Sequence, residues 1–262
     1  MSVACVGDNC IDRYTAPVRL DMVGGNALNV AVRLARRGLP TAYLGAIGAD
    51  AEGGAVAAAL TAAGVDIDRL SVRPGETGVT IVELTAAGDR VFVAERLGVG
   101  IGYRPSPDEM AFLRGCEWVH AAGLSDPGQL AGLHPSRMSY DFSQIGAGAM
   151  LDELAPILEV AFLSGDGMTR REAVELARST VASGTRLAVV TRGREGSLAW
   201  NGRLVEQPAA PVEVVDTLGA GDALIAGVIA ALVEGAAVDG ALAAGGEAAA
   251  LACGHYGAWQ PA

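Results

Sequence analysis

Short apolar runs rich in β-branched residues alternate along the chain with longer segments rich in alanine and leucine. Runs of this kind, bounded by glycine or polar residues, are typical of buried strands in a parallel sheet. The pattern predicts strands at 3–7, 41–47, 118–120, 138–142, 160–163 and 187–191, and helices at 27–37, 53–63, 107–113, 152–158, 170–181, 220–233 and 238–251. This alternation indicates an α/β fold whose mostly parallel sheet is covered by helices on both faces.

Two stretches break the alternation. Residues 78–84 and 90–95 have strand-like patterns and are separated only by residues 85–89, whose Gly-Asp pair predicts a hairpin turn. Together with a short strand near 13–20, the region 70–95 is expected to form a small β-sheet lid on a single domain that spans residues 1–262. Residues 196–214 are expected to form an edge of the main sheet. Ligands bind at the carboxyl ends of the strands in open α/β sheets, and such a lid would cover them there.

The amino-acid composition excludes several classes of protein and partner. Hydrophobic residues make up 51% of the 262 positions and charged residues 19%, which excludes a disordered chain. The formal charge is −11, from 19 basic and 30 acidic residues, so neither nucleic acid nor an anionic membrane is an expected partner. Every basic residue is an arginine. The lack of lysine excludes Schiff-base and pyridoxal-phosphate enzymes, the P-loop and the protein-kinase fold, and leaves backbone N–H groups, arginine and metal for binding phosphate.

Other motif classes are missing as well. The four cysteines form no CxxC pair, so we expect reduced thiols and a cytoplasmic protein. No basic signal-peptide region precedes the first strand, and the longest apolar run, 223–233, is too short to span a bilayer. The three histidines lie far apart without metal-ligand spacing. Neither a serine-hydrolase elbow nor an opening GxGxxG motif occurs.

The most informative segment is the glycine-rich turn at 215–222, which leads into the last-but-one predicted helix. Gly219 and Gly221 allow the backbone to approach a ligand. The free N–H groups of the first helical turn, with the helix dipole, form an anion site that needs no lysine. Asp222 is suited to accept a proton from a hydroxyl group that attacks the bound anion. The alternative is a structural turn in which Asp222 only caps the helix.

This turn, Asp-Thr-Leu-Gly-Ala-Gly-Asp at 216–222, resembles the C-terminal signature of the ribokinase-like (PfkB) sugar kinases. Gly-Gly-Asn-Ala-Leu-Asn-Val-Ala at 24–31 resembles their N-terminal signature, and the two occur in the family's order. The resemblance covers essentially the whole chain. It implies a three-layer α/β/α fold that transfers a phosphoryl group from ATP to a primary alcohol of a sugar. It also implies Asp222 as the catalytic base and the backbone of Gly219, Ala220 and Gly221 as the anion hole.

The resemblance further implies residues that bind each substrate. The sugar-binding candidates are Asp12, Gly25, Asn26 and Asn29. Residues 191–197 resemble the family's nucleotide loop, although a plain strand–turn–strand connection has similar residues. The ATP-binding candidates are Ser164, Thr191, Gly193, Gly196 and, beside the adenine, Gly245.

The metal-binding pattern departs from the family. Its Asn-x-x-Glu motif, which helps to organise Mg²⁺, is replaced by Ser164 and Gly167 at the two positions. Either Asp166 substitutes for the glutamate or the nucleotide phosphates hold Mg²⁺, which keeps several waters and needs few protein ligands. Asp141, at a strand end, is a further carboxylate candidate or a simple cap. The resemblance also implies a monovalent cation near Asp216, so the expected cofactors are ATP, Mg²⁺ and, optionally, K⁺.

Four further stretches, 7–12, 88–92, 140–143 and 255–259, resemble the fructoselysine 6-kinase branch of the family. This implies phosphorylation at O6 of a fructosamine, whose amino-acid tail would meet the lid and Arg90. A ketohexokinase or nucleoside-kinase specificity stays open, as does a catalytically weak sugar- or nucleotide-binding protein. The expected partners are a small-molecule sugar and ATP. A second copy paired through the exposed lid edges would form a homodimer.

Overall fold

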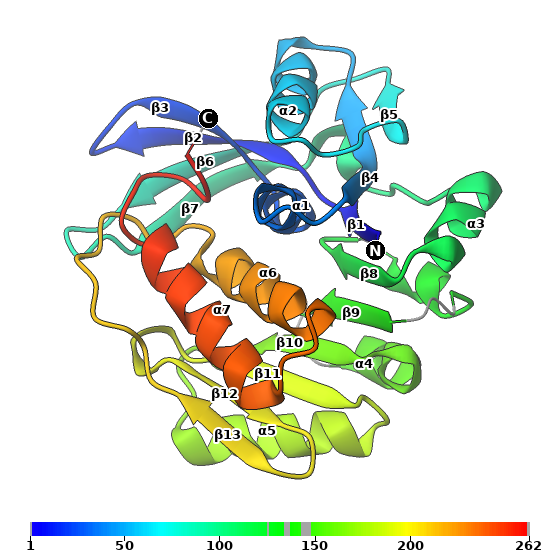
Figure 1. Ribbon diagram of the computed structural model, residues 1–262. Helices are drawn as coiled ribbons and strands as arrows, with labels where there is room; N and C mark the ends of the chain where they lie inside the picture. The colour runs from blue at the N-terminus through cyan, green and yellow to red at the C-terminus, as the bar shows by residue number, and fades with distance from the viewer. Residues whose placement is uncertain (1, 125, 134–136, 143–147, 261–262) are drawn as a thin grey trace.

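The computed structural model describes residues 2–124, 126–133, 137–142 and 148–260, and Figure 1 shows two sheets with helices around the larger one. Among the described residues, the larger sheet has nine strands in the order β13-β12-β11-β10-β9-β8-β1-β4-β5. They are β1 (Val3–Gly7), β4 (Thr41–Gly48), β5 (Leu70–Arg73), β8 (Trp118–Ala122), β9 (Arg137–Asp141), β10 (Val160–Ser164), β11 (Leu187–Thr191), β12 (Ser197–Trp200) and β13 (Leu204–Gln207). The strands from β11 to β5 are parallel, whereas β12 and β13 form the antiparallel edge predicted for 196–214.

Helices cover both faces of this sheet because alternate side chains of a strand point to opposite sides. In β1, Val3 and Cys5 join one buried cluster, whereas Ala4 and Val6 join another. The first cluster includes α1 (Asn26–Arg36), α2 (Ala51–Ala62), α6 (Ala220–Val233) and α7 (Val238–Ala252), and the second includes α3 (Pro107–Gly115), α4 (Ala149–Leu154) and α5 (Arg170–Ala182). The predicted α/β class, with a mostly parallel sheet between helix layers, is confirmed.

Local chemistry moves two helix boundaries from their predicted places. The helix predicted at 152–158 ends at Leu154 and continues as one 3-10 turn, Ala155–Ile157, because Pro156 lacks the N–H that an α-helix needs. The helix α2 begins at Ala51 because Asp50 accepts the Gly53 N–H at 2.8 Å and caps it. Within the described residues, every helix is too short or too polar to cross a membrane.

The smaller sheet has the strand order β3-β2-β6-β7. Its strands are β2 (Cys10–Ala16), β3 (Leu20–Gly24), β6 (Val79–Leu84) and β7 (Arg90–Arg96). The predicted hairpin at 78–95 is therefore present. The lid boundaries predicted at 13–20 and 70–95 need correction. The smaller sheet also contains β3, which follows β2, and it does not contain β5, which belongs to the larger sheet. β5 pairs in parallel with β4 after the crossover helix α2, which makes it the outer strand of the larger sheet.

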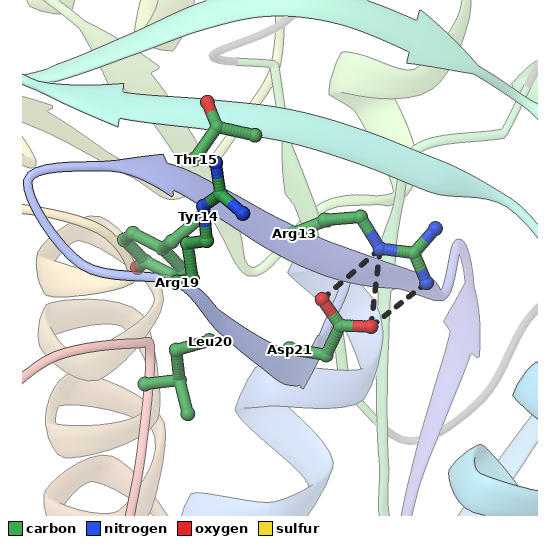
Figure 2. A pocket seen from close by; sticks show the side chains of 6 residues that line it. All are labelled: Arg13, Tyr14, Thr15, Arg19, Leu20 and Asp21. Carbon is green, nitrogen blue, oxygen red and sulfur yellow. Dashed lines mark hydrogen bonds and ion pairs between the residues drawn. The ribbon is translucent and has the colours of Figure 1, made fainter.

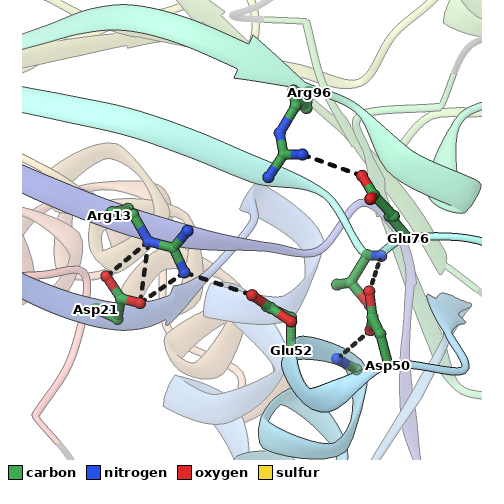
Figure 3. A network of polar contacts seen from close by, with 8 residues as sticks. Arg13, Asp21, Asp50, Glu52, Glu76 and Arg96 are labelled. Carbon is green, nitrogen blue, oxygen red and sulfur yellow. Dashed lines mark hydrogen bonds and ion pairs between the residues drawn. The ribbon is translucent and has the colours of Figure 1, made fainter.

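Polar contacts fasten the smaller sheet to α2, as Figure 3 shows. Arg13 on β2 pairs with Asp21 on β3 at 2.8 Å and with Glu52 on α2 at 3.4 Å. Asp50 accepts the backbone N–H of Thr77, just before β6, at 2.7 Å, and the Thr77 hydroxyl at 2.6 Å. The ion pairs are partly exposed and contribute at most about 1 kcal/mol each, so they position the smaller sheet more than they stabilise it.

Candidate active site

The N-terminus of α1 is held by the residue that follows β1. Asp8 accepts the backbone N–H of Asn26 at 2.9 Å and that of Ala27 at 3.0 Å. Gly25 has a φ of 115°, and a Cβ there would lie 2.5 Å from Cα of Asn9, so only glycine lets α1 begin this close to β1. Asp8 therefore fixes the segment that carries the predicted sugar-binding residues.

Asp222, in the first turn of α6, faces α1. It is buried, and its Oδ2 accepts a hydrogen bond of 2.7 Å from Nδ2 of Asn29. Oδ1 of Asn29 accepts the indole N–H of Trp259 at 3.0 Å. Burial raises the pKa of Asp222 to about 8 against the opposing effect of the Asn29 bond, and the charges of Asp141 and Asp8 act with burial. A carboxylate with this pKa is suited to accept a proton near neutral pH.

The turn before α6 has the form of an anion site. Gly219 has a φ of 74° and lies against the C-terminal segment, so a Cβ there would be strained and would clash. The N–H of Ala220 already bonds within the turn at 3.3 Å. In the described part of the chain, no acceptor engages the N–H groups of Gly221 and Asp222, and no atom lies within 4 Å of the Cβ position of Gly221. A phosphoryl oxygen can approach these two N–H groups.

Asp12, on β2, lies against the backbone at the start of the Gly-Gly-Asn segment. A Cβ on Gly24 would be 1.9 Å from Oδ2 of Asp12, so the carboxylate rests directly on this glycine. Burial raises the pKa of Asp12 to about 7, opposed by a 3.4 Å bond from the Cys10 thiol. The side chain of Asn26 is half-buried and has no hydrogen bond within the described residues. Asp12 and Asn26 can therefore both pair with hydroxyl groups of a ligand.

Asn29 differs from the other sugar-binding candidates. Both ends of its amide are engaged, one by Asp222 and the other by Trp259. Asn29 is therefore a partner of the predicted base, and its role in binding the sugar stays a prediction.

Asp216, the residue predicted beside a monovalent cation, is fully buried. Its Oδ1 accepts the N–H of Leu218 at 2.8 Å, and its Oδ2 accepts the N–H of Gly257 at 2.9 Å and the hydroxyl of Tyr14 on β2. These partners are hydrogen-bond donors, which a cation would have to displace. K⁺ at Asp216 stays a prediction. Asp216 therefore connects the turn at residues 215–222, called here the anion turn, to the smaller sheet.

The nucleotide-binding candidates gather at one edge of the larger sheet. Ser164 ends β10 and Thr191 ends β11, and the two are direct partners in the parallel register. Gly193 follows with a φ of 53° and open space at its Cβ position. At Gly196, with a φ of 92°, a Cβ would lie 2.1 Å from the carbonyl oxygen of Gln207, so this glycine shapes the turn into β12. The loops after β10 and β11 thus form one surface.

Gly245 does not join this surface. It is buried on α7, where a Cβ would lie 2.8 Å from Cγ2 of Val228 and 2.9 Å from the carbonyl oxygen of Leu224. Its role is to let α6 and α7 pack closely, which corrects the expectation that it lies beside the adenine.

The hairpin turn of the smaller sheet contacts both the anion turn and the nucleotide loop. The N–H of Thr217 donates to the carbonyl of Gly88 at 3.1 Å, and the N–H of Arg90 donates to the Thr217 hydroxyl at 3.3 Å. Asp89 pairs with Arg194 at 3.3 Å. Arg90 therefore lies beside the anion turn, and the hairpin is in a position to couple the smaller sheet to both loops.

The acidic residues available for a metal are dispersed. The described residues contain no group of three or more His, Cys, Asp or Glu side chains that could hold a metal ion. Asp166 is exposed in the loop after β10, where its N–H bonds to Oγ of Ser164 at 3.4 Å. Asp141 is buried at the end of β9, close enough to influence Asp222. A Mg²⁺ ion at Asp166 stays a prediction.

A cavity of about 490 Å³ opens at the β2–β3 hairpin, as Figure 2 shows. It is lined by Arg13, Tyr14, Thr15, Arg19, Leu20 and Asp21. None of the predicted site residues lines it. Of its lining residues, Tyr14 reaches the site through its bond to Asp216, and the Arg13 guanidinium is already paired with Asp21. We therefore assign the active site to the convergence of α1, α6 and the smaller sheet.

Sequence reasoning missed three residues of this site: Asp8, Tyr14 and Trp259. Asp8 and Trp259 lie in the stretches 7–12 and 255–259, whose resemblance to a branch of the family gives these two residues no role of their own. Ser143, in another of those stretches, lies outside the described residues.

Comparison with known proteins identifies the family. The family model described as pfkB family carbohydrate kinase matches residues 19–98 and 153–262. Fructosamine kinase FrlD of Bacillus subtilis (strain 168) is 35% identical over 268 residues, covering 99% of this chain and 93% of its own. Fructoselysine 6-kinase of Escherichia coli (strain K12) is 34% identical over 263 residues, covering 98% and 99%.

Solved structures share the fold. Arabidopsis thaliana ribokinase complexed with ribose and ATP matches with a TM-score of 0.83 at 24% identity, over 98% of this chain and 93% of its own. A Vibrio cholerae O395 fructokinase bound to fructose, ADP and calcium matches with a TM-score of 0.80 at 20% identity, over 99% and 95%. With the family model covering most of the chain, this protein belongs to the pfkB family of carbohydrate kinases and is an ATP-dependent sugar kinase.

Proposed function

We propose that this kinase phosphorylates the primary hydroxyl at O6 of a fructosamine such as fructoselysine. The observation that carries the proposal is the similarity to fructosamine kinase FrlD and fructoselysine 6-kinase over nearly the whole chain. A fructokinase of Klebsiella pneumoniae and a nucleoside kinase of Methanothermobacter thermautotrophicus match at only 26% identity over 81% of the chain. Fructosamine chemistry is therefore favoured over a plain ketohexose or a nucleoside.

In the proposed reaction, Asp222 accepts the proton of the O6 hydroxyl while O6 attacks the γ-phosphorus of ATP. The O6–P bond forms, the bond to the β,γ-bridging oxygen breaks, and ADP leaves with that electron pair. The N–H groups of Gly221 and Asp222 and the dipole of α6 stabilise the charge on the transferring phosphoryl group. The N–H of Gly219, which also has no acceptor among the described residues, is part of the proposed anion hole, whereas Ala220, whose N–H bonds to Thr217, shapes the turn.

The sugar-binding part of the proposal uses Asp12, Asn26 and the backbone at Gly25 for the ring hydroxyls. The charges of Asp8, Asp216 and Glu95 all raise the pKa of Asp12, so the electrostatic field at Asp12 is negative. A fructosamine carries an amine that is protonated near neutral pH, and a cation is favourable in such a field. Fructose lacks this amine, so the acidic site supplies a physical reason for discrimination.

On the ATP side, the proposal assigns the nucleotide to the loops of Ser164, Thr191, Gly193 and Gly196. Asp166, through water, would help to hold the Mg²⁺ ion that enters with ATP, and this ion would supply positive charge to offset that of the phosphates. We propose a cytoplasmic reaction, which suits an ATP-dependent enzyme whose cysteines Cys5, Cys10, Cys116 and Cys253 are free thiols.

A panel of acceptors tests this function. An ADP-release assay should give a higher kcat/KM for fructoselysine than for fructose, ribose or adenosine. Arg90→Ala should reduce kcat/KM for fructoselysine selectively, whereas Arg96→Ala, on the same strand, should not. A nucleoside or a pentose as the best acceptor would overturn the fructosamine assignment but not the kinase assignment.

A homodimer paired through the lid is also part of the proposal. β7 is the outer strand of the smaller sheet, and Val91, Phe92 and Val93 are 45%, 42% and 54% exposed. An apolar strand edge of this kind tends to pair with another chain. Sedimentation at micromolar concentration should show a dimer that Val93→Asp dissociates, and a monomeric unmodified protein would refute the pairing.

A further inference from the structure

We propose that Trp259 is a positioning residue for Asp222, acting through Asn29, and that its indole N–H fixes which end of the Asn29 amide faces the base. The inference rests on the proposed role of Asp222 as the proton acceptor. It assigns a function to the C-terminal segment 255–260, which contributes no atom to the proposed chemistry.

The argument begins with the donors and acceptors. An indole N–H can only donate, so the group that faces it on Asn29 must be Oδ1, at 3.0 Å. The amide then presents its NH₂ end to Asp222, at 2.7 Å. An amide turned by 180° would place Oδ1 against the carboxylate and leave the indole N–H unpaired. All three side chains are at least 90% buried, so water cannot replace a lost partner cheaply.

The helix that carries Asn29 also holds Trp259 in place. Arg36, near the end of α1, lies 5.0 Å from the centre of the Trp259 ring and donates to the carbonyl of Gln260 at 2.6 Å. Arg33, one turn earlier, donates to the carbonyl of Ala258. Trp259 is therefore held from both sides along the chain, since α1 donates to the carbonyl of the residue before it and to that of the residue after it.

The charges around Asp222 determine what loss of this bond would do. Asp8, after β1, and Asp141, on β9, disfavour the ionised form of Asp222, whereas Arg33 and the Asn29 bond from α1 favour it. If the amide is free to turn, the ionised form loses its hydrogen bond and the pKa of Asp222 rises further. Less of the base is then ionised at pH 7, while little changes at high pH.

Trp259→Phe tests the proposal, because it removes the N–H and keeps a ring for Arg36. The pH profile of kcat/KM should move to higher pH by about one unit, with about a tenfold loss at pH 7 that vanishes near pH 9.5. The KM for ATP should not change. Trp118→Phe is the matched control, since it also removes a buried indole hydrogen bond, to Oγ of Ser139 at 2.8 Å. It should leave the profile in place.

A loss equal at every pH, or an unmoved profile, would overturn the positioning role. A failure of the base assignment gives a different result. The pH profile of kcat/KM for the unmodified enzyme would then show no ionisation near pH 8, and Asp222→Asn would keep its turnover. If Trp259→Phe does not fold, Arg36→Gln loosens the same segment and should move the profile in the same direction by a smaller amount. An unmoved profile in folded Arg36→Gln would equally refute the proposal.

Discussion

Replacing Asp222 by asparagine should abolish turnover and, at the same time, stabilise the fold at alkaline pH. The substitution keeps the size of the side chain, and the new carbonyl oxygen can still accept the hydrogen bond from Asn29. It removes the proton acceptor, and positioned general-base catalysis is worth roughly 10²–10⁴-fold. We therefore expect kcat to fall at least 100-fold, while ATP and sugar still bind.

The stability effect follows from proton linkage. The pKa of Asp222 rises from 3.8 to about 8 in the fold, so between these values the folded chain holds a proton that the unfolded chain has lost. Stability conferred by this protonated group is present at low pH and is lost as the pH rises through 8. From pH 5 to pH 8, three units at about 1.4 kcal/mol each correspond to a loss on the order of 4 kcal/mol. The Asp222→Asn variant does not lose this free energy of unfolding, because its side chain does not titrate.

Urea unfolding at pH 5, 6.5 and 8 measures the effect. The free energy of unfolding of Asp222→Asn, minus that of the unmodified protein, should grow by about 4 kcal/mol over this range. Asp166→Asn, at an exposed carboxylate, provides the matched control and should give a flat difference. If the Asp222 difference is also flat, the carboxyl group is not held protonated by burial, and its suitability as a base near pH 8 is refuted.

Further predictions concern the turn and the ions. Gly221→Val should abolish phosphoryl transfer with an unchanged Tm, because its side chain would enter open space where a phosphate must approach; normal kinetics would make the turn purely structural. Gly219→Ala should destabilise the fold by about 1–3 kcal/mol in urea unfolding, given its positive φ, and an unchanged midpoint would contradict this. A monovalent cation near Asp216 predicts faster turnover in K⁺ than in an alkali-metal-free buffer, and equal rates would remove that ion from the account.

Periodicity predicted the inner strands of the large sheet well because they are buried on both faces. A run such as Val3–Gly7 is apolar throughout, and this pattern needs only local sequence to be read. In the smaller sheet the hairpin was predicted nearly to its ends, whereas β2 and β3 were predicted as one short strand at 13–20. The start of β3 is exposed, so its pattern carries little signal of burial. The assignment of β5 depended on pairing with β4, which local sequence does not encode.

The site residues also differ in whether local sequence predicts them. The glycine-rich turn and Asp222 were predictable because their chemistry lies within a few consecutive residues. The bond from Trp259 to Asn29 joins residues 230 positions apart, and that from Asn29 to Asp222 spans 193. No local pattern reports such contacts. The two glycines show the same limit, since only the structure separates Gly219, which the fold requires, from Gly221, whose side-chain position is open.

The position of the new phosphate on the product tests the central claim most directly. The enzyme, MgATP and fructoselysine would be incubated to completion and the product examined by proton-coupled ³¹P NMR. Phosphorylation at O6 predicts a phosphomonoester signal split by the two protons on C6, because Asp222 and the anion turn act on a primary hydroxyl. A signal split by a single proton would place the phosphate on a secondary hydroxyl and contradict the account, as would the absence of any phosphorylated sugar.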